Sequence, residues 1–326
     1  MKLAVVIVSY NSAGYLTECI ESVYAHTAGV DVDVIVVDNG STDGSVALIE
    51  GRFPAVTLVR SENRGFAHAN NRGFARTDAP FVLFLNPDTE IQSGAFADLL
   101  EVFGARGDVG LIGCRQVTTD GELCASIRRF PTPARNLLEA LGSERFPVKA
   151  SWMGERELDR RAYERETPCD WVSGSFMLAR REALLATGGL DERYFLFAED
   201  PDLCAGVKAA GWQVCYSPKM SIVHHGGDNS ENPRLEAQRA YARRQYMFKH
   251  HGLVTRTLCT GALMLFYARR AVGPSPKGRD ARASRAAARA ALRTLWGSTP
   301  PPFGELSGPL RGPRVWRPGS PMSESS

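Results

Sequence analysis

Three short apolar runs in the first ninety residues are each followed directly by polar side chains. These groups include two carboxylates, several amides and hydroxyls, and they fall at Ser9-Tyr10-Asn11, Asp38-Asn39-Gly40 and Asn86-Pro87-Asp88-Thr89. If the runs are parallel strands, their carboxyl ends meet at one edge of a sheet, where open α/β sheets bind ligands. Ordinary turn chemistry explains any one segment alone, because Asn, Asp, Gly and Ser end strands routinely. Because such polar groups follow all three apolar runs, a binding site at this edge is the favoured interpretation.

Asp88 is suited to hold a divalent cation. It follows an apolar run and a proline that stiffens the turn, and carboxylate oxygen is a donor that Mg²⁺ and Mn²⁺ prefer. Such an ion can bridge a substrate diphosphate and neutralise charge as the diphosphate leaves. His224, after the apolar run 220–223, is a candidate further ligand or a contact of the diphosphate. The alternative for His224 is an ordinary surface-loop histidine.

A predicted helix opens at Arg64-Gly65 and offers a cation and free N–H groups to the same anion. Taken alone, Arg64 is typical of a solvated surface residue. No G-x-G-x-x-G follows the first strand and no P-loop motif occurs, which argues against a dinucleotide or an ATP held by a P-loop. A bound diphosphate must therefore be held in another way.

A second acidic group follows the apolar run 195–198 and consists of Glu199, Asp200 and Asp202. Helix capping alone explains it, because Asp200 before Pro201 is a good N-cap and Asp202 suits the positive end of a helix dipole. The functional interpretation makes one carboxylate a general base that deprotonates an acceptor hydroxyl. A glycosidase also needs a carboxylic acid to protonate its leaving group. A metal-bound nucleoside diphosphate leaves without such an acid, so a single base suffices here.

The elements that must position these residues alternate between strand and helix. Apolar runs predict strands at 3–8, 32–37, 56–59 and 81–85, and helical spacing predicts helices at 13–27, after Ser41-Thr42-Asp43 and at 65–76. Further on, we expect helices near 94–104, 181–186, 201–210 and 234–251, and strands near 109–118, 171–179, 213–216 and 220–223. The polar stretch 126–168 is a candidate lid or acceptor loop. Buried strands joined by helices indicate an α/β protein with a doubly wound, mostly parallel sheet.

Composition and charge exclude several classes of protein. With 326 residues, 44% hydrophobic and 23% charged, the chain is an ordinary globular protein, and its net charge of +3 does not indicate nucleic-acid binding. Seven scattered cysteines without a C-x-x-C pair indicate neither a disulfide framework nor a zinc site, and favour a reducing cytoplasm. No apolar stretch approaches the roughly 20 residues of a membrane span.

Together these motifs resemble the inverting family 2 glycosyltransferases of GT-A fold, and among them the bacterial rhamnosyltransferases that use dTDP-L-rhamnose. The resemblance covers residues 5–230, and the order and spacing of the motifs make it specific. It rests on Val8-Ser9-Tyr10-Asn11, Val36-Val37-Asp38-Asn39-Gly40-Ser41-Thr42-Asp43, Asn63-Arg64-Gly65-Phe66, Asn70-Asn71, Leu85-Asn86-Pro87-Asp88-Thr89, Ser173-Gly174-Ser175-Phe176, Gly188-Gly189-Leu190-Asp191, Glu199-Asp200 with Asp202-Leu203, and His224.

The resemblance implies a role for each candidate residue. Asp200 is the implied base, with Glu199 orienting it or the sugar, and Asp88 with His224 is the implied site of Mg²⁺ or Mn²⁺. Because Asn86 stands where a full D-x-D motif has its first carboxylate, that metal site carries less negative charge. The implied nucleotide-sugar contacts are Ser9, Tyr10, Asn11, Asp38, Asn39, Arg64, Gly65, Asn71 and Asn86.

The chain is accordingly expected to divide into a nucleotide-sugar-binding half (1–90) and an acceptor-binding half (91–232) of one domain, a basic helical region (233–297) and a disordered tail (298–326). In the helical region the apolar stretch 257–267 precedes 269–293, where eight cations face one anion. This pattern favours attachment to the anionic cytoplasmic face of a membrane, near a polyprenyl-linked acceptor. A plain packing helix with a solvated basic tail is the alternative.

The predicted function is transfer, with inversion, of L-rhamnose from dTDP-L-rhamnose to a hydroxyl of a cell-envelope glycan or polyprenyl-linked glycolipid. A UDP- or GDP-sugar donor is an alternative. A nucleotidyltransferase on a similar sheet is another, although the basic, glycine-rich loop expected after its first strand is absent. A non-catalytic nucleotide-sugar or glycan-binding homologue is the third, and the presence of Asp88 and Asp200 argues against it.

Overall fold

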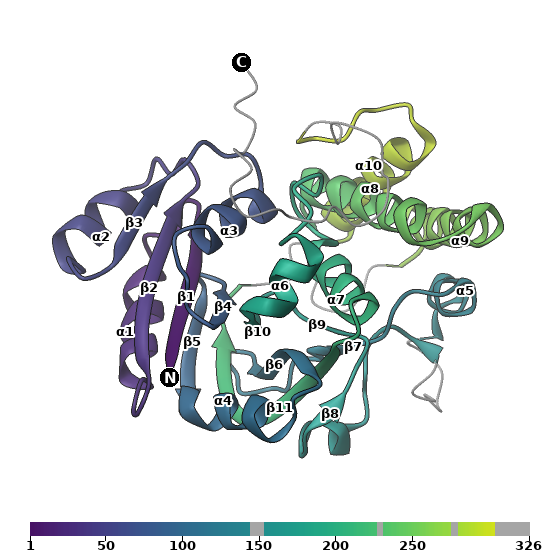
Figure 1. Cartoon of the computed structure of the whole chain (residues 1–326). Helices are drawn as coiled ribbons and strands as arrows, with labels where there is room; N and C mark the ends of the chain where they lie inside the picture. Colours follow the sequence, from purple (N-terminus) through teal and green to yellow (C-terminus); the bar gives the residue numbers. More distant parts are fainter. Residues whose placement is uncertain (144–152, 227–230, 275–279, 304–326) are drawn as a thin grey trace.

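The computed structural model describes residues 1–143, 153–226, 231–274 and 280–303, and a large mixed sheet forms its centre (Figure 1). Its strands follow the order β3-β2-β1-β4-β10-β6-β11-β5, with β8 paired to β11. Their bounds are β1 Lys2–Ser9, β2 Asp31–Asp38, β3 Thr57–Arg60, β4 Phe81–Leu85, β5 Thr89–Ser93, β6 Val109–Val117, β8 Thr167–Pro168, β10 Phe176–Arg180 and β11 Gln213–His224. A second, two-stranded sheet pairs β7 (Ile127–Arg128) with β9 (Trp171–Val172).

Helices cover both faces of the large sheet, as the buried strands predict. Alternate residues of β1 enter opposite cores: Leu3 and Ile7 pack with α1, α2 and α4, whereas Ala4 and Val6 pack with α3, α6 and α7. The helices are α1 Leu16–Ala25, α2 Ser45–Arg52, α3 Phe66–Phe74, α4 Phe96–Ala105, α5 Pro133–Leu141, α6 Arg181–Thr187, α7 Glu199–Ala209, α8 Pro233–His250, α9 Leu253–Val272 and α10 Ala281–Trp296. The predicted α/β class is confirmed.

The strands β1, β2, β3 and β4 are all parallel, but β10 runs antiparallel between β4 and β6. The single strand expected at 171–179 is therefore wrong, because Ser173–Ser175 separate β9 from β10. The reversal brings this turn to the same sheet edge as the carboxyl ends of β1, β2 and β4. There the Asn86 N–H donates to the Ser175 carbonyl at 3.1 Å.

Two other expectations differ from the structure, and one strand was not expected. The two strands expected at 213–216 and 220–223 form one strand, β11, whose register shifts between Ser217 and Ser221. β5, which the sequence pattern missed, pairs with the end of β11. Helix α2 begins at Ser45 rather than at residues 41–43, because Gly44 at φ +91° forms its N-cap and Asp43 accepts from the Ser45 N–H at 3.0 Å.

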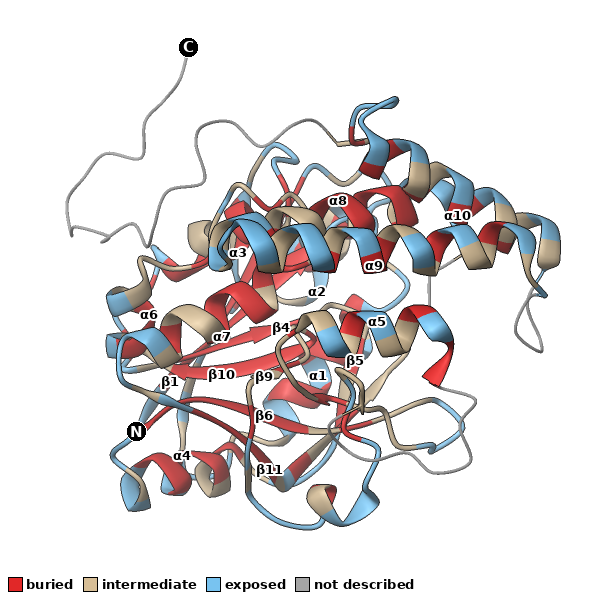
Figure 2. Cartoon of the chain, turned by 90° about the vertical axis from the view of Figure 1, so that its right-hand side faces the viewer, coloured by how far each residue is buried: buried red, intermediate tan, exposed pale blue. Residues whose placement is uncertain are grey.

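The helices α8, α9 and α10 gather on one side of the molecule, and α5 lies along α9 (Figures 1 and 2). Small and apolar side chains, including Ala240, Leu263, Tyr267 and Ala291, form their common core. No helix within the described ranges is long and apolar enough to cross a membrane. Of the tail expected to be disordered, residues 298–303 are described, and the Phe303 ring stacks on Phe195 with centroids 4.8 Å apart. Residues 304–326 lie outside the described part.

Candidate active site

The carboxyl ends of β1 and β2 place two buried oxygens side by side. Ser9 and Asp38 are register partners, and the Asn39 N–H donates to the Ser9 carbonyl at 2.7 Å. One carboxylate oxygen of Asp38 accepts from the Ser41 N–H at 3.2 Å, which orients the group. The other, Oδ1, and the hydroxyl of Ser9 are buried without a hydrogen-bond partner in the described residues. Buried polar atoms are normally satisfied, so these two adjacent oxygens are candidate ligand contacts.

Near Ser9 and Asp38, the side chains of Asn11 and Asn39 connect neighbouring loops. The Tyr10 side chain is exposed. Asn11, at φ +52°, accepts from the Thr42 N–H at 2.8 Å. The Asn39 side-chain amide donates to Asn63 Oδ1 at 3.0 Å, which holds the turn that carries Arg64. Each asparagine thus has a positioning contact within the protein.

The turn at Arg64 and Gly65 joins the sheet edge at the ends of β1 and β2 to the acidic segment. Gly65 has φ +103°, and a Cβ there would lie 2.5 Å from the Phe195 carbonyl oxygen. That same oxygen accepts from the Phe66 N–H at 2.7 Å. Only glycine fits this backbone approach. Arg64 is exposed beside the junction.

Asn71 was expected to contact the nucleotide sugar, but its amide is used within the protein. Its N–H groups donate to the Leu190 carbonyl at 2.8 Å and to Glu192 at 2.9 Å, and its oxygen accepts from the Leu190 N–H at 2.9 Å. His68 on the same helix contacts Glu192 at 2.9 Å. Asn71 therefore positions the segment that leads to Glu199.

Asp88 and His224 are brought together by the pairing of β5 with β11, which makes Thr89 the register partner of His224. His224 Nε2 lies 3.3 Å from Asp88 Oδ1. This oxygen and Oδ1 of Asn86 are both buried and make no hydrogen bond in the described part of the chain. At Gly226 a Cβ would lie 2.1 Å from Asp88 Oδ2, so the chain passes directly over the carboxylate.

These groups fit a Mg²⁺ or Mn²⁺ site that is completed by its substrate. A carboxylate oxygen and an amide oxygen that make no hydrogen bond in the described residues, beside an imidazole nitrogen, form a suitable donor set for such ions. Among the residues that the structure describes, no cluster of three His, Cys, Asp or Glu side chains could hold a metal. Mg²⁺ is commonly held by one or two carboxylates together with substrate phosphates.

The acidic pair begins helix α7. Its N-cap is Ala198, which with Phe197 has a positive φ, at +66° and +71°, a strained conformation for residues other than glycine. Asp200 therefore does not cap the helix. Its Oδ2 accepts from the Gly174 N–H at 3.1 Å, across the turn between β9 and β10.

Asp202, two residues further along, has a structural role. Its carboxylate is buried and contacts Lys249 at 2.7 Å and His250 at 2.6 Å, both on α8. Lys249 also pairs with Asp191 at 2.7 Å. These ion pairs fix α7 to α8, so Asp202 is not a candidate base.

The environments of Glu199 and Asp200 raise both carboxyl pKa values. Burial raises the pKa of Asp200 to about 6, against the opposing effects of the Gly174 N–H and the charge of Arg128. Burial, reinforced by the charge of Asp200, raises the pKa of Glu199 well above its ordinary value. Slightly above neutral pH, Asp200 is therefore mostly ionised, while Glu199 is the carboxyl group that more readily keeps a proton.

Two residues of this site lie in the stretch 109–168, where the sequence pattern offers no motif. Gln116 accepts from the Ser175 hydroxyl at 2.9 Å, and its own amide nitrogen is buried without a partner in the described residues. Arg128 on β7 lies close enough to Asp200 to lower its pKa. Only the pairing of β7 with β9 brings Arg128 to Asp200.

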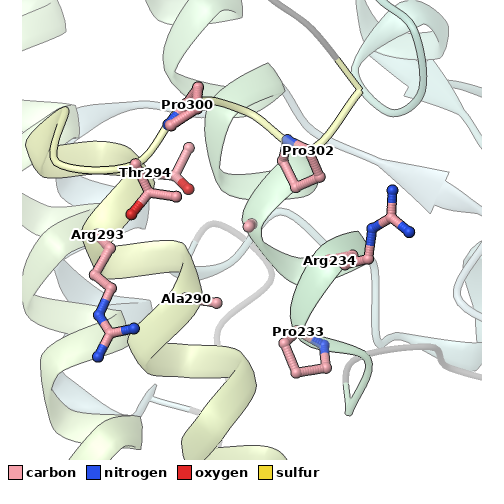
Figure 3. A pocket seen from close by; sticks show the side chains of 9 residues that line it. Pro233, Arg234, Ala290, Arg293, Thr294, Pro300 and Pro302 are labelled. Atoms are coloured by element: carbon pink, nitrogen blue, oxygen red, sulfur yellow. The ribbon is translucent and has the colours of Figure 1, made fainter.

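Two open hollows lie elsewhere on the described part of the protein. A hollow of about 190 Å³ between α8 and α10 is formed by small, proline and threonine side chains, and the guanidinium groups of Arg234 and Arg293 point in opposite directions (Figure 3). No set of polar groups converges on it, as ligand recognition requires. A second hollow of about 260 Å³ is lined by Phe81 at the start of β4 and Arg180 at the end of β10, so it lies at the opposite sheet edge from Asp38, Asp88 and Asp200.

The fold and the site together define a glycosyltransferase of GT-A fold, and the chain belongs to glycosyl transferase family 2, whose profile matches residues 4–185. An N-acetylglucosaminyl-diphospho-decaprenol L-rhamnosyltransferase of Mycobacterium tuberculosis is 31% identical over 265 residues, 77% of this chain and 85% of the relative. The rhamnosyltransferase WbbL of Escherichia coli is 24% identical over 68% of this chain and 82% of its own length.

A solved structure shares the fold. The mannosyltransferase PcManGT of Pyrobaculum calidifontis, in complex with GDP-Man and Mn²⁺, aligns with a TM-score of 0.56 and 20% identity, covering 91% of this chain and 88% of that one. The predicted family and GT-A fold are confirmed.

Proposed function

We propose that this glycosyltransferase transfers L-rhamnose from dTDP-L-rhamnose, with inversion, to a hydroxyl of an N-acetylglucosaminyl diphosphate carried on a polyprenol. The observation that carries the proposal is the gathering of Asp38, Asp88 and Asp200 at one sheet edge, the last with a pKa of about 6. The Mycobacterium tuberculosis relative, named for this type of transfer, supports the choice of donor sugar and acceptor.

In this proposal the nucleoside lies against the ends of β1 and β2. The unsatisfied oxygens of Ser9 and Asp38 accept its polar hydrogens, and the exposed Tyr10 ring is available for stacking. Arg64 offers its charge to the diphosphate. Asp88 and His224, with Asn86 beside them, hold Mg²⁺ or Mn²⁺, which when bound neutralises charge on the departing diphosphate. The Mn²⁺ in the PcManGT structure supports this assignment.

Asp200 is the base of the proposed reaction. The Gly174 N–H occupies Oδ2, which leaves Oδ1 to accept the proton of the acceptor hydroxyl. The acceptor oxygen bonds to the anomeric carbon as the bond to the diphosphate breaks, and the bonding electrons leave with the diphosphate. Attack from the opposite side inverts the configuration. Glu199, retaining its proton, donates a hydrogen bond that orients the sugar or Asp200.

The proposed acceptor is a membrane lipid, and α9 carries a surface suited to a bilayer. Its outward positions Val254, Leu258 and Val272 are 72%, 57% and 80% exposed, and no charged residue interrupts the exposed stripe they form with Gly261 and Leu265 (Figure 2). The neighbouring helix α10 exposes cations and a tryptophan at Arg282, Arg289, Arg293 and Trp296. An apolar stripe beside cations fits an anionic leaflet.

The membrane contact is tested by sedimentation with phosphatidylglycerol vesicles. Replacing both Leu258 and Leu265 with Glu is expected to reduce binding severalfold, because buried apolar area is lost and negative charge is added. Leu158→Glu, at a leucine that is equally exposed but lies elsewhere, is the matched control. If the double variant and Leu158→Glu bind the vesicles equally well, the proposal that α9 contacts the membrane is wrong.

The proposed function is tested with purified protein, Mn²⁺ or Mg²⁺, and a short-chain polyprenyl-diphosphate N-acetylglucosamine. The expected product is a rhamnosylated lipid whose anomeric configuration, determined by NMR, is opposite to that of dTDP-L-rhamnose. Turnover with a UDP- or GDP-sugar but not with dTDP-L-rhamnose would refute the donor assignment. Donor binding without any product would instead favour the non-catalytic binding protein.

A further inference from the structure

Two arginines lie side by side next to the base. Arg128 on β7 forms an antiparallel bridge with Arg156, so the two residues occupy neighbouring positions on adjacent extended segments. The Arg128 guanidinium lies 5.5 Å from the centroid of the Trp171 ring. That ring is held in place, because its N–H donates to the Arg129 carbonyl at 2.9 Å. The indole thus gives Arg128 a fixed platform.

Neither arginine is neutralised by an ion pair within the described residues, whereas Arg129, the next along the chain, pairs with Glu157. Nε of Arg128 is buried and has no hydrogen-bond partner there. Glu155, an acid whose charge acts on Arg128, is paired with Arg243. Two adjacent cations with free donors repel one another, and an anion with several oxygens relieves that repulsion while accepting bidentate hydrogen bonds.

The strand pairing places this cationic pair close to Asp200. Ile127 on β7 is the register partner of Val172 on β9, and the Ser173 N–H donates to the Ser126 carbonyl at 3.2 Å. The next residue, Gly174, holds the carboxylate of Asp200. An acceptor whose hydroxyl contacts Asp200 therefore has its nearest anionic group within reach of Arg128.

The chain then leads from Arg128 to an apolar surface. Phe130 packs in the cluster that contains Tyr194 and Tyr246, and α5 begins at Pro133. Helix α5 lies along α9 and exposes Leu137 and Leu141. From the base outward, the order of features is thus a carboxylate, two cations and an apolar surface. A lipid-linked sugar has the matching order of hydroxyl, diphosphate and hydrocarbon.

We propose that Arg128 and Arg156 bind the diphosphate of the lipid-linked acceptor. This inference rests on the proposed function for the acceptor class. The protein then has two diphosphate sites. The donor diphosphate lies at Arg64, Asp88 and His224, and the acceptor diphosphate lies at the β7–β9 sheet.

The kinetic test compares two acceptors, a short-chain polyprenyl-diphosphate N-acetylglucosamine and octyl β-N-acetylglucosaminide, which lacks the diphosphate. Arg128→Gln and Arg156→Gln are each expected to raise the KM of the diphosphate acceptor by about 10-fold or more, the loss of a hydrogen bond to a charged group. For Arg156→Gln, whose side chain is exposed, the rate with the octyl glycoside and the KM of dTDP-L-rhamnose are expected to stay within about 2-fold, well below that loss. Arg160→Gln, at an exposed arginine nearby, is the control.

A binding measurement separates this inference from the proposed reaction. Titration calorimetry with farnesyl diphosphate is expected to show binding by the unaltered protein and by Arg160→Gln, and weakened binding by both test variants. If no sugar is transferred but this pattern holds, the proposed function fails and the diphosphate site stands. For a folded Arg156→Gln, equal losses with both acceptors, a raised KM for dTDP-L-rhamnose alone, or unchanged binding of farnesyl diphosphate would overturn the inference. Because Arg156 is exposed, that variant keeps the test decisive even if Arg128→Gln does not fold.

Discussion

Replacing Asp200 with Asn should inactivate the protein while making it more stable at alkaline pH. The folded-state pKa of about 6 exceeds the ordinary value of 3.8, so the folded chain binds this proton more tightly than the unfolded chain. Above pH 6 the buried charge costs up to about 3 kcal/mol. Asparagine removes that charge and keeps an oxygen that can accept from the Gly174 N–H. The gain should be largest above pH 6 and shrink as the pH falls from 6 towards 4.

The activity of Asp200→Asn should fall although its stability rises. Loss of a general base lowers kcat by about 10²- to 10⁴-fold, measured as initial rates of transfer to the lipid-linked acceptor. Stability is measured by urea unfolding at pH 8 and pH 4.5. Asp202→Asn is the matched comparison, because its buried carboxylate pairs with Lys249 and His250, and breaking a buried ion pair costs about 3–5 kcal/mol.

The two variants, two residues apart on one helix, should thus differ in the sign of their effect on stability. An Asp200→Asn protein that keeps more than about a tenth of the kcat, far above the loss expected for a missing base, would refute the assignment of the base. A variant that is less stable than the parent at pH 8 would refute the argument from burial.

Three further predictions concern the same edge of the sheet. The rate of transfer should fall on the acid side with an apparent pKa near 6, because only ionised Asp200 accepts a proton; a rate independent of pH between 5 and 8 would contradict this. Gly65→Ala should lower stability by at least about 1–3 kcal/mol in thermal unfolding, since its φ is positive and Phe195 blocks a Cβ. Asp88→Asn should raise the Mn²⁺ concentration required for half-maximal activity, whereas the exposed Asp108→Asn should leave it unchanged.

Much of the structure of residues 1–90 could be predicted from sequence because its signals are local. An uninterrupted run of β-branched residues such as Val34–Val37 is typical of a strand buried on both faces, and the polar residues that end such a strand then lie at the sheet edge. For the same reason Ser9, Asp38 and Asp88 were correctly expected at one edge. The pairing of His224 with Asp88 was also expected, although only the register of β5 and β11 brings the two within 3.3 Å.

Other features depended on contacts between distant segments. A helix start at Ser41-Thr42-Asp43 was expected from side-chain capping, but Gly44 can adopt a positive φ that those residues disfavour, and the helix begins later. Asp200 before Pro201 has the residue types of a helix N-cap. Its carboxylate instead accepts a hydrogen bond from the Gly174 N–H, which comes from the turn between β9 and β10.

By itself, the sequence determined which residue types end which strands, because hydrophobic periodicity and turn chemistry act over a few residues. Only the tertiary structure decided that β10 runs antiparallel, that Asn71 supports the acidic segment, and that Arg128 stands beside Asp200. Strand direction, the burial that raises a pKa, and the adjacency of two arginines all depend on which distant segments pack together. No local pattern of residues encodes that information.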